Sequence, residues 1–69
     1  MLAIYNITDS FGRTGQVRLR NDGKLERRLC GQRIWRPIAH VDISIFSEED
    51  VQESLKATEG IVKVMRQRG

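Results

Sequence analysis

The segment QVRLRNDGKLERRL, residues 16 to 29, decides the fold, because two alternating stretches flank the strong turn signal NDG. A two-residue loop that ends at Gly23 would place Leu19 opposite Glu26. A three-residue loop, with Gly23 in the left-handed conformation, instead places Leu19 opposite Leu25. We expect the three-residue loop, because its register pairs apolar with apolar residues and sets opposite charges across from each other.

A second turn follows in CGQR, residues 30 to 33, where Gly31 can supply the positive φ of a type II′ turn. This turn would place Leu29 opposite Ile34, so that two more apolar residues pair across the strands. Pro37 has no N–H to donate to a ladder and therefore indicates an edge, a bulge or a break.

The two turns together sort the side chains of this region onto two faces of a sheet. The apolar face, which should meet a helix, carries Val17, Leu19, Leu25, Leu29 and Ile34. The opposite face carries Gln16, Arg18, Arg20, Lys24, Glu26, Arg28 and Trp35. Arg27 falls in phase with the apolar set, and we expect it to lie at an edge and to reach outward to solvent.

The flanking segments supply further elements. Residues 2 to 8, LAIYNIT, are apolar on both alternating sets and indicate a central strand. Residues 39 to 45 alternate apolar and polar side chains, which is typical of a half-buried strand. Residues 48 to 59 indicate a helix, with Ser47 as the N-cap and Asp50 near the capping-box position.

The segment IVKVMR, residues 61 to 66, follows Gly60, which can act as a left-handed C-cap of the helix. One longer helix through Gly60 is the alternative, but the β-branched run favours a fifth strand. Residues 1 to 69 would then form a single α+β domain, a mainly antiparallel sheet of four or five strands with the helix packed on one face. A small SH3-like barrel is the alternative fold.

Charge is unevenly distributed along the chain. Residues 13 to 36 carry eight basic and two acidic side chains, whereas residues 45 to 59 carry one lysine and five acidic side chains. Cys30 is the only cysteine, so no internal disulfide can form, and the sequence has no apolar run long enough to span a bilayer. These features predict a polarised protein in a reducing, cytoplasmic setting.

The basic face and its tryptophan predict a nucleic-acid-binding surface, since arginine suits phosphate and an indole can stack a base. We expect an accessory protein that binds DNA in preference to RNA. Its predicted contact residues are Arg13, Arg18, Arg20, Lys24, Arg28, Arg33, Trp35 and Arg36. The alternative is a protein-interaction module or inhibitor that uses the basic and acidic faces, and the thin core of so small a domain favours a homodimer.

The sequence carries no catalytic or metal-binding pattern, so we expect neither an enzyme nor a bound cofactor or metal. Cys30, His40 and Asp42 are the residue types of a nucleophile, a base and an orienting acid, but nothing in the sequence brings Cys30 to the other two. One histidine and one cysteine do not make a zinc site. The loop FGRTG, residues 11 to 15, is either a plain turn or a small anion-binding nest to which Arg13 adds charge.

Two segments resemble parts of small DNA-binding domains in which three antiparallel strands precede a helix, such as integrase arm-binding and plant AP2 domains. VRLRNDGKLERRL resembles their basic hairpin, and IFSEEDVQESL resembles the strand-end phenylalanine and the capped helix. The resemblance is an analogy of organisation that covers about residues 16 to 58. The N-terminal strand is extra, and GQRIWRPIAH has no obvious counterpart in those domains.

Overall fold

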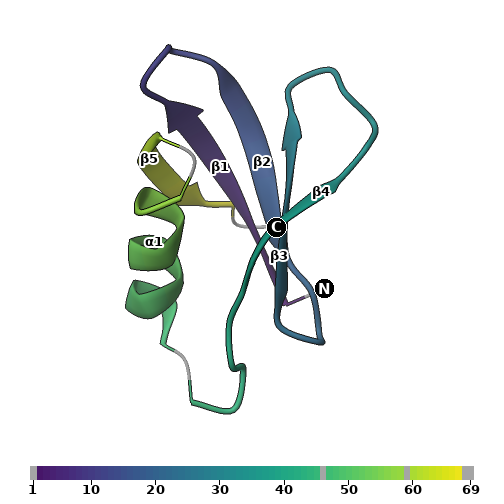
Figure 1. Ribbon diagram of the computed structural model, residues 1–69, viewed down its shortest axis with the longest axis vertical. Helices are drawn as coiled ribbons and strands as arrows, with labels where there is room; N and C mark the ends of the chain where they lie inside the picture. Colours follow the sequence, from purple (N-terminus) through teal and green to yellow (C-terminus); the bar gives the residue numbers. More distant parts are fainter. Residues whose placement is uncertain (1, 46, 59, 68–69) are drawn as a thin grey trace.

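Five strands and one helix follow one another in the computed structural model, which describes residues 2–45, 47–58 and 60–67 (Figure 1). The strands are β1 (Ala3–Asp9), β2 (Thr14–Leu19), β3 (Lys24–Leu29), β4 (Arg36–His40) and β5 (Ile61–Arg66), and the helix is α1 (Glu48–Lys56). Phe46, the strand-end phenylalanine, and Glu59, the last residue of the expected helix, lie outside the described residues.

The strands form a single antiparallel sheet in the order β4-β3-β2-β1-β5. The expected α+β fold is therefore confirmed, with β1 as an interior strand between β2 and β5 and with a fifth strand after the helix. The sheet is open, because β4 and β5 are its two edges in the described residues. Pro37 lies on the edge strand β4, opposite Glu26 and next to a shift in register, so the expected edge and bulge are both present.

The β2–β3 hairpin has the three-residue loop that charge and apolar matching predicted. Leu19 pairs with Leu25 and Arg18 pairs with Glu26. Gly23 has a φ of 90°, and its carbonyl oxygen accepts a hydrogen bond of 2.9 Å from the backbone N–H of Val41. The turn is thereby joined to the chain that follows β4.

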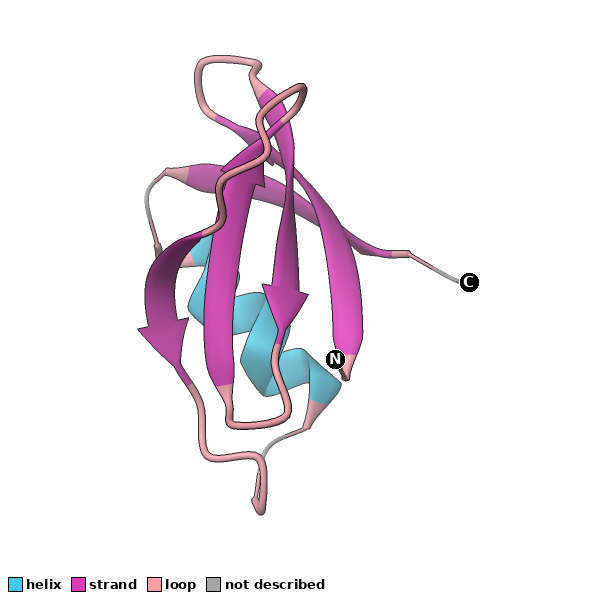
Figure 2. Ribbon diagram, turned by 90° about the vertical axis from the view of Figure 1, so that its right-hand side faces the viewer, coloured by secondary structure: helices cyan, strands magenta, loops and turns pink. Residues whose placement is uncertain are grey.

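Helix α1 packs on one face of the sheet, and Figure 2 shows it lying behind the strands. Its N-cap is the predicted capping box, in which the Ser47 hydroxyl accepts from the Asp50 N–H and the Asp50 carboxylate accepts from the Ser47 N–H. The core between helix and sheet consists of Tyr5, Ile7, Val17, Leu19, Leu25, Val51, Leu55 and Ile61. The helix ends at Lys56, earlier than expected, and Gly60 has a φ of 70° without being the cap residue.

The predicted strand over residues 39 to 45 is wrong after its second residue, because β4 ends at His40. The Asp42 carboxylate accepts hydrogen bonds from the Ser44 hydroxyl at 2.6 Å and from the Ser44 N–H at 3.0 Å, which folds the segment into a turn. A backbone bond from Ile45 to Asp42 closes this turn, and the Ile45 side chain is 80% exposed. Local side-chain bonds override the alternating pattern here.

The second predicted turn falls one residue earlier than expected. The Gln32 N–H donates to the Leu29 carbonyl at 3.0 Å, so Gly31 is the third residue of the turn, where a type II turn requires its positive φ. Strand pairing resumes only at Arg36, after a loop over residues 30–35. Ile34, which was expected in the core, lies in this loop and is 80% exposed.

Candidate nucleic-acid interface

The sheet face turned away from α1, here called the outer face, carries side chains from four strands. Burial of Val17, Leu19 and Leu25 on the helix side sends the alternate residues of β2 and β3 to the other side. The pairings with β1 and β5 extend the same alternation across the sheet. On β1, β2, β3 and β5 the outer face consists of Ile4, Asn6, Thr8, Thr14, Gln16, Arg18, Lys24, Glu26, Arg28, Lys63 and Met65.

The indole of Trp35 contacts two guanidinium groups of the outer face. The central guanidinium carbon lies 4.4 Å from the ring centroid for Arg18 and 4.7 Å for Arg28, both within cation–π range. Trp35 immediately precedes β4, and continuing the β3–β4 register by one residue sets it opposite Arg28, as the sequence predicted. Gln16 holds the second guanidinium in place, because its side-chain oxygen accepts from Arg28 Nε at 3.1 Å and Nη2 at 2.7 Å.

On the outer face, two of the predicted contact residues are engaged with carboxylates. Arg18 Nε lies 2.8 Å from Glu26 Oε1, and Arg20 lies 3.7 Å from the same carboxylate and 3.5 Å from that of Asp22. The pKa of Asp22 is lowered by the Lys24 N–H that it accepts and by the positive charges of Arg20 and Lys24. These pairs neutralise much of the positive charge at this end of the outer face.

The remaining predicted contact residues divide between the two sides of the sheet. Lys24 is exposed on the outer face, and Arg33 is exposed in the loop before β4. Arg36 pairs with Arg27, in phase with the helix side of the sheet. Arg13 bonds to a carboxylate at the opposite end of β2 from Arg20. The structure therefore brings Arg18, Arg20, Lys24, Arg28 and Trp35 together on one face and leaves Arg13 and Arg36 off it.

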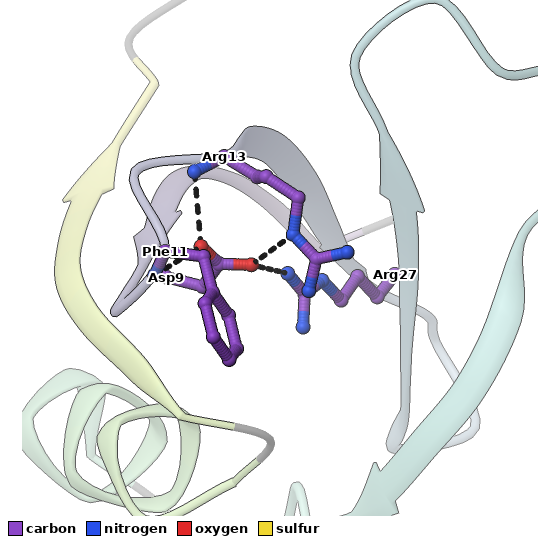
Figure 3. Close-up of polar contacts among 4 residues, drawn as sticks. All are labelled: Asp9, Phe11, Arg13 and Arg27. Atoms are coloured by element: carbon purple, nitrogen blue, oxygen red, sulfur yellow. Dashed lines mark hydrogen bonds and ion pairs between the residues drawn. The ribbon is translucent and has the colours of Figure 1, made fainter.

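A buried carboxylate on the helix side holds the β1–β2 turn (Figure 3). Asp9, 2% exposed, accepts the N–H groups of Phe11 and Arg13 at 3.0 and 2.9 Å, and its second oxygen accepts Arg13 Nε at 2.9 Å. Burial alone would raise the pKa of Asp9, but these hydrogen bonds and the Arg13 charge outweigh it, so the pKa is lowered. The possible anion nest of residues 11 to 15 is thus directed at the carboxylate of the chain itself.

Arg27 does not reach outward, as the sequence had suggested, but is 5% exposed on the helix side. Its Nη2 lies 3.4 Å from the second carboxylate oxygen of Asp9. The apolar phase of Arg27 was therefore a correct sign of burial, and a charge can be buried there because an acidic partner is buried with it. The sequence did not indicate this partner, since Asp9 precedes a loop and the strand order was unknown.

A groove of about 560 Å³ lies on the outer face beside Arg28. Polar side chains of the sheet line it, together with Lys63 and Met65 of β5 and the turn that contains Cys30. The sequence alone does not reveal this groove, because only the β1–β5 pairing brings Lys63 opposite Thr8. The alternation of β5 would have placed Lys63 on the outer face if its neighbour in the sheet had been known.

The residue types of a thiol enzyme are not assembled in the structure. His40 pairs with Lys24 at the start of β3, whereas Cys30 follows the end of that strand, some 20 Å away along the extended chain. His40 Nε2 lies 3.1 Å from the carbonyl oxygen of Asp22. Within the described ranges no group of three or more histidine, cysteine or acidic side chains could hold a metal ion.

Comparisons of the chain with protein-family models, with curated proteins and with solved structures gave no match. The analogy with three-stranded DNA-binding domains therefore has no support beyond the residues that carry it. In the part of the chain that the structure describes, no helix has the length and apolar character needed to cross a bilayer.

Proposed function

We propose that this protein is a small accessory nucleic-acid-binding protein that uses its outer face. The observation that carries the proposal is the contact of the Trp35 indole with Arg18 and Arg28 on a sheet face that α1 leaves uncovered. Aromatic rings stack bases whatever their sequence, and arginine binds phosphate through a planar fork. The two chemistries that single nucleotides require thus lie side by side.

Arg28 is the residue best suited to contact phosphate. A guanidinium has five N–H donors, of which Gln16 engages two, so three remain for an anion. Among the described residues no carboxylate lies within salt-bridge distance of Arg28, in contrast to Arg18 and Arg20. Because Gln16 is neutral, it orients the guanidinium without cancelling its charge.

We further propose a ligand and a cellular compartment for this protein. DNA is the first ligand to test, because the basic hairpin resembles those of small DNA-binding domains, and RNA is the second. We place the protein in the cytoplasm, where an exposed free thiol such as that of Cys30 would remain reduced. We assign it no catalytic role and no cofactor.

A second candidate function is protein association, and the edge strand β5 favours it. Val62 and Met65 on this strand are 60% and 57% exposed, and an unpaired edge can add a strand from another chain. The simplest partner would be a second copy. Light scattering over a range of protein concentrations tests this candidate, and a mass that stays monomeric at all concentrations would contradict the homodimer.

Fluorescence anisotropy with labelled oligonucleotides, titrated over a range of salt concentrations, tests the proposed function. We expect Arg28→Ala to weaken binding and to reduce the slope of log K against log salt by about 0.7 to 0.9, the loss of one phosphate contact. Lys56→Ala is the matched control, because it removes the same charge from the exposed last turn of α1. Equal losses for the two variants, or no binding by the wild type at low salt, would contradict the proposal.

A further inference from the structure

The geometry points to a more specific ligand: the groove beside Arg28 accommodates one unpaired nucleotide of a single-stranded nucleic acid. This inference rests on the proposed function and narrows it. The groove volume of about 560 Å³ falls within the range of about 300 to 1,000 Å³ that small-molecule sites occupy. The sheet forms its floor, while β5 and the turn over residues 30–32 contribute opposite ends of its lining.

The charges around the groove suit an anion. Arg28 and Lys63 both line it, and none of its lining residues is acidic. They stand on different strands, since Lys63 pairs with Thr8 of β1 and Arg28 pairs with Gln16 of β2. A nucleotide within a strand has a phosphate on each side, so two separated cations match it better than one cluster would.

The floor of the groove suits a nucleobase. Asn6 and Thr14 line it with an amide and a hydroxyl, and neither side chain makes a hydrogen bond within the described part of the chain. Amide and hydroxyl groups can donate to and accept from the edge of a base. Met65 of β5 adds apolar surface against which a planar ring can pack.

Gln16 acts as a positioning residue on this floor. Its amide oxygen accepts from Arg28, and its amide nitrogen donates to the side-chain oxygen of Gln67 at 3.3 Å. The side chains of Gln16 and Gln67 together bridge β1, so that Gln16 links Arg28 of β3 to the residue that follows β5. This network fixes Arg28 at the border between the groove and Trp35. A base in the groove and a neighbouring base on the indole would then lie on either side of one guanidinium.

The groove selects single strands because a base can enter it only after leaving a duplex stack. Unstacking and unpairing one base of a duplex costs a few kcal/mol, whereas a flexible single strand presents its bases at little cost. We therefore expect tighter binding of a single strand than of a duplex of equal length. The backbone contacts alone would give the opposite order, since a duplex has the higher charge density.

The test compares four ligands at low salt: an oligodeoxythymidine of about ten nucleotides, a duplex of that length, an abasic strand with the same number of phosphates, and free thymidine monophosphate. Cys30 provides a second readout, because it is exposed and lines the groove, so a ligand there should slow its reaction with N-ethylmaleimide. We expect the single strand to bind about tenfold or more tightly than the abasic strand and to protect Cys30. We expect Asn6→Ala to weaken binding severalfold, and Asn21→Ala, an exposed asparagine of the β2–β3 turn, to leave it unchanged.

The outcomes separate the two proposals. Absence of binding to every strand would overturn the proposed function and this inference with it. Binding that is equal for single strand, duplex and abasic strand, with Cys30 unprotected, would leave the proposed function standing and overturn the groove. Protection of Cys30 by thymidine monophosphate as strong as that by the single strand would also overturn it, because the ligand would then be a free nucleotide.

Discussion

Gly23 offers the sharpest test of the hairpin register on which the outer face depends. Its φ of 90° is a conformation that L side chains rarely adopt, and a Cβ added there would clash with the backbone oxygen of Val41. Gly31 is a natural control, because its φ of 86° is nearly the same and a Cβ there would meet nothing within 4 Å. Alanine at the two positions therefore shares the conformational strain and differs in the clash.

The expected losses of stability follow from these contacts. The left-handed conformation costs a non-glycine residue about 1 to 2 kcal/mol, so Gly31→Ala should lose about 1 kcal/mol of unfolding free energy. Gly23→Ala carries the same strain and must also displace Val41, whose N–H donates to Gly23 at 2.9 Å. Losing that hydrogen bond adds about 0.5 to 1.5 kcal/mol, and residual crowding brings the total to about 2 to 4 kcal/mol.

Thermal unfolding followed by circular dichroism measures the difference. For a domain of this size 1 kcal/mol corresponds to about 4 to 8 °C, so we expect Gly23→Ala to melt at least 5 °C below Gly31→Ala. Amide hydrogen exchange gives an independent readout, because protection of the Val41 N–H should fall only in Gly23→Ala. Equal melting temperatures with Val41 still protected would refute the close approach of the turn to the chain after β4.

Three further outcomes are expected. Asp9→Asn should destabilise the protein at pH 7, and the difference in unfolding free energy from wild type should shrink below about pH 4. The pKa of Asp9 is lowered in the folded protein, so the stability that this carboxylate contributes is present above its unfolded-state pKa and is lost as the pH falls through its folded-state pKa. A difference that is the same in urea unfolding at pH 7 and at pH 2 would contradict this. Leu25→Ala, at a fully buried position, should lower the unfolding free energy by about 2 to 5 kcal/mol, whereas Ile34→Ala in its exposed loop should change it by less than about 0.5 kcal/mol. Similar losses for the two variants in urea unfolding would show that Ile34 is packed in the core. Ser47→Ala should cost about 1 kcal/mol through loss of the capping box, and an unchanged urea midpoint would rule out that cap.

Local chemistry made much of the fold predictable from the sequence. The β2–β3 register followed from pairing Leu19 with Leu25, and the helix start followed from the capping box at Ser47. The loss of strand structure after His40 was missed, because the bonds between Ser44 and Asp42 compete with the alternating pattern. Such turns form where side-chain hydrogen bonds to the local backbone are more favourable than strand pairing, and hydrophobic alternation carries no information on that balance.

The candidate site was harder to predict, because it depends on the order of the strands. The basic face around Arg28 and Trp35 followed from two adjacent strands, so the sequence was sufficient to place it. The pairing of Arg18 with Glu26 was expected from the register, but its neutralising effect on the face became clear only from the 2.8 Å contact. Lys63 could not be assigned to the face without knowing that β5 pairs with β1.

The most direct test of the outer face as a nucleic-acid interface is an NMR titration of the labelled protein with a single-stranded oligonucleotide at low salt. Trp35 is the only tryptophan, so its indole N–H gives one resolved probe of the face, and Lys56 on α1 reports the opposite side. We expect the indole N–H of Trp35 and the side-chain amide of Gln16 to shift progressively while α1 stays unperturbed. Chemical-shift changes confined to α1, or an indole signal that does not move at saturating oligonucleotide, would contradict the outer face as a nucleic-acid interface.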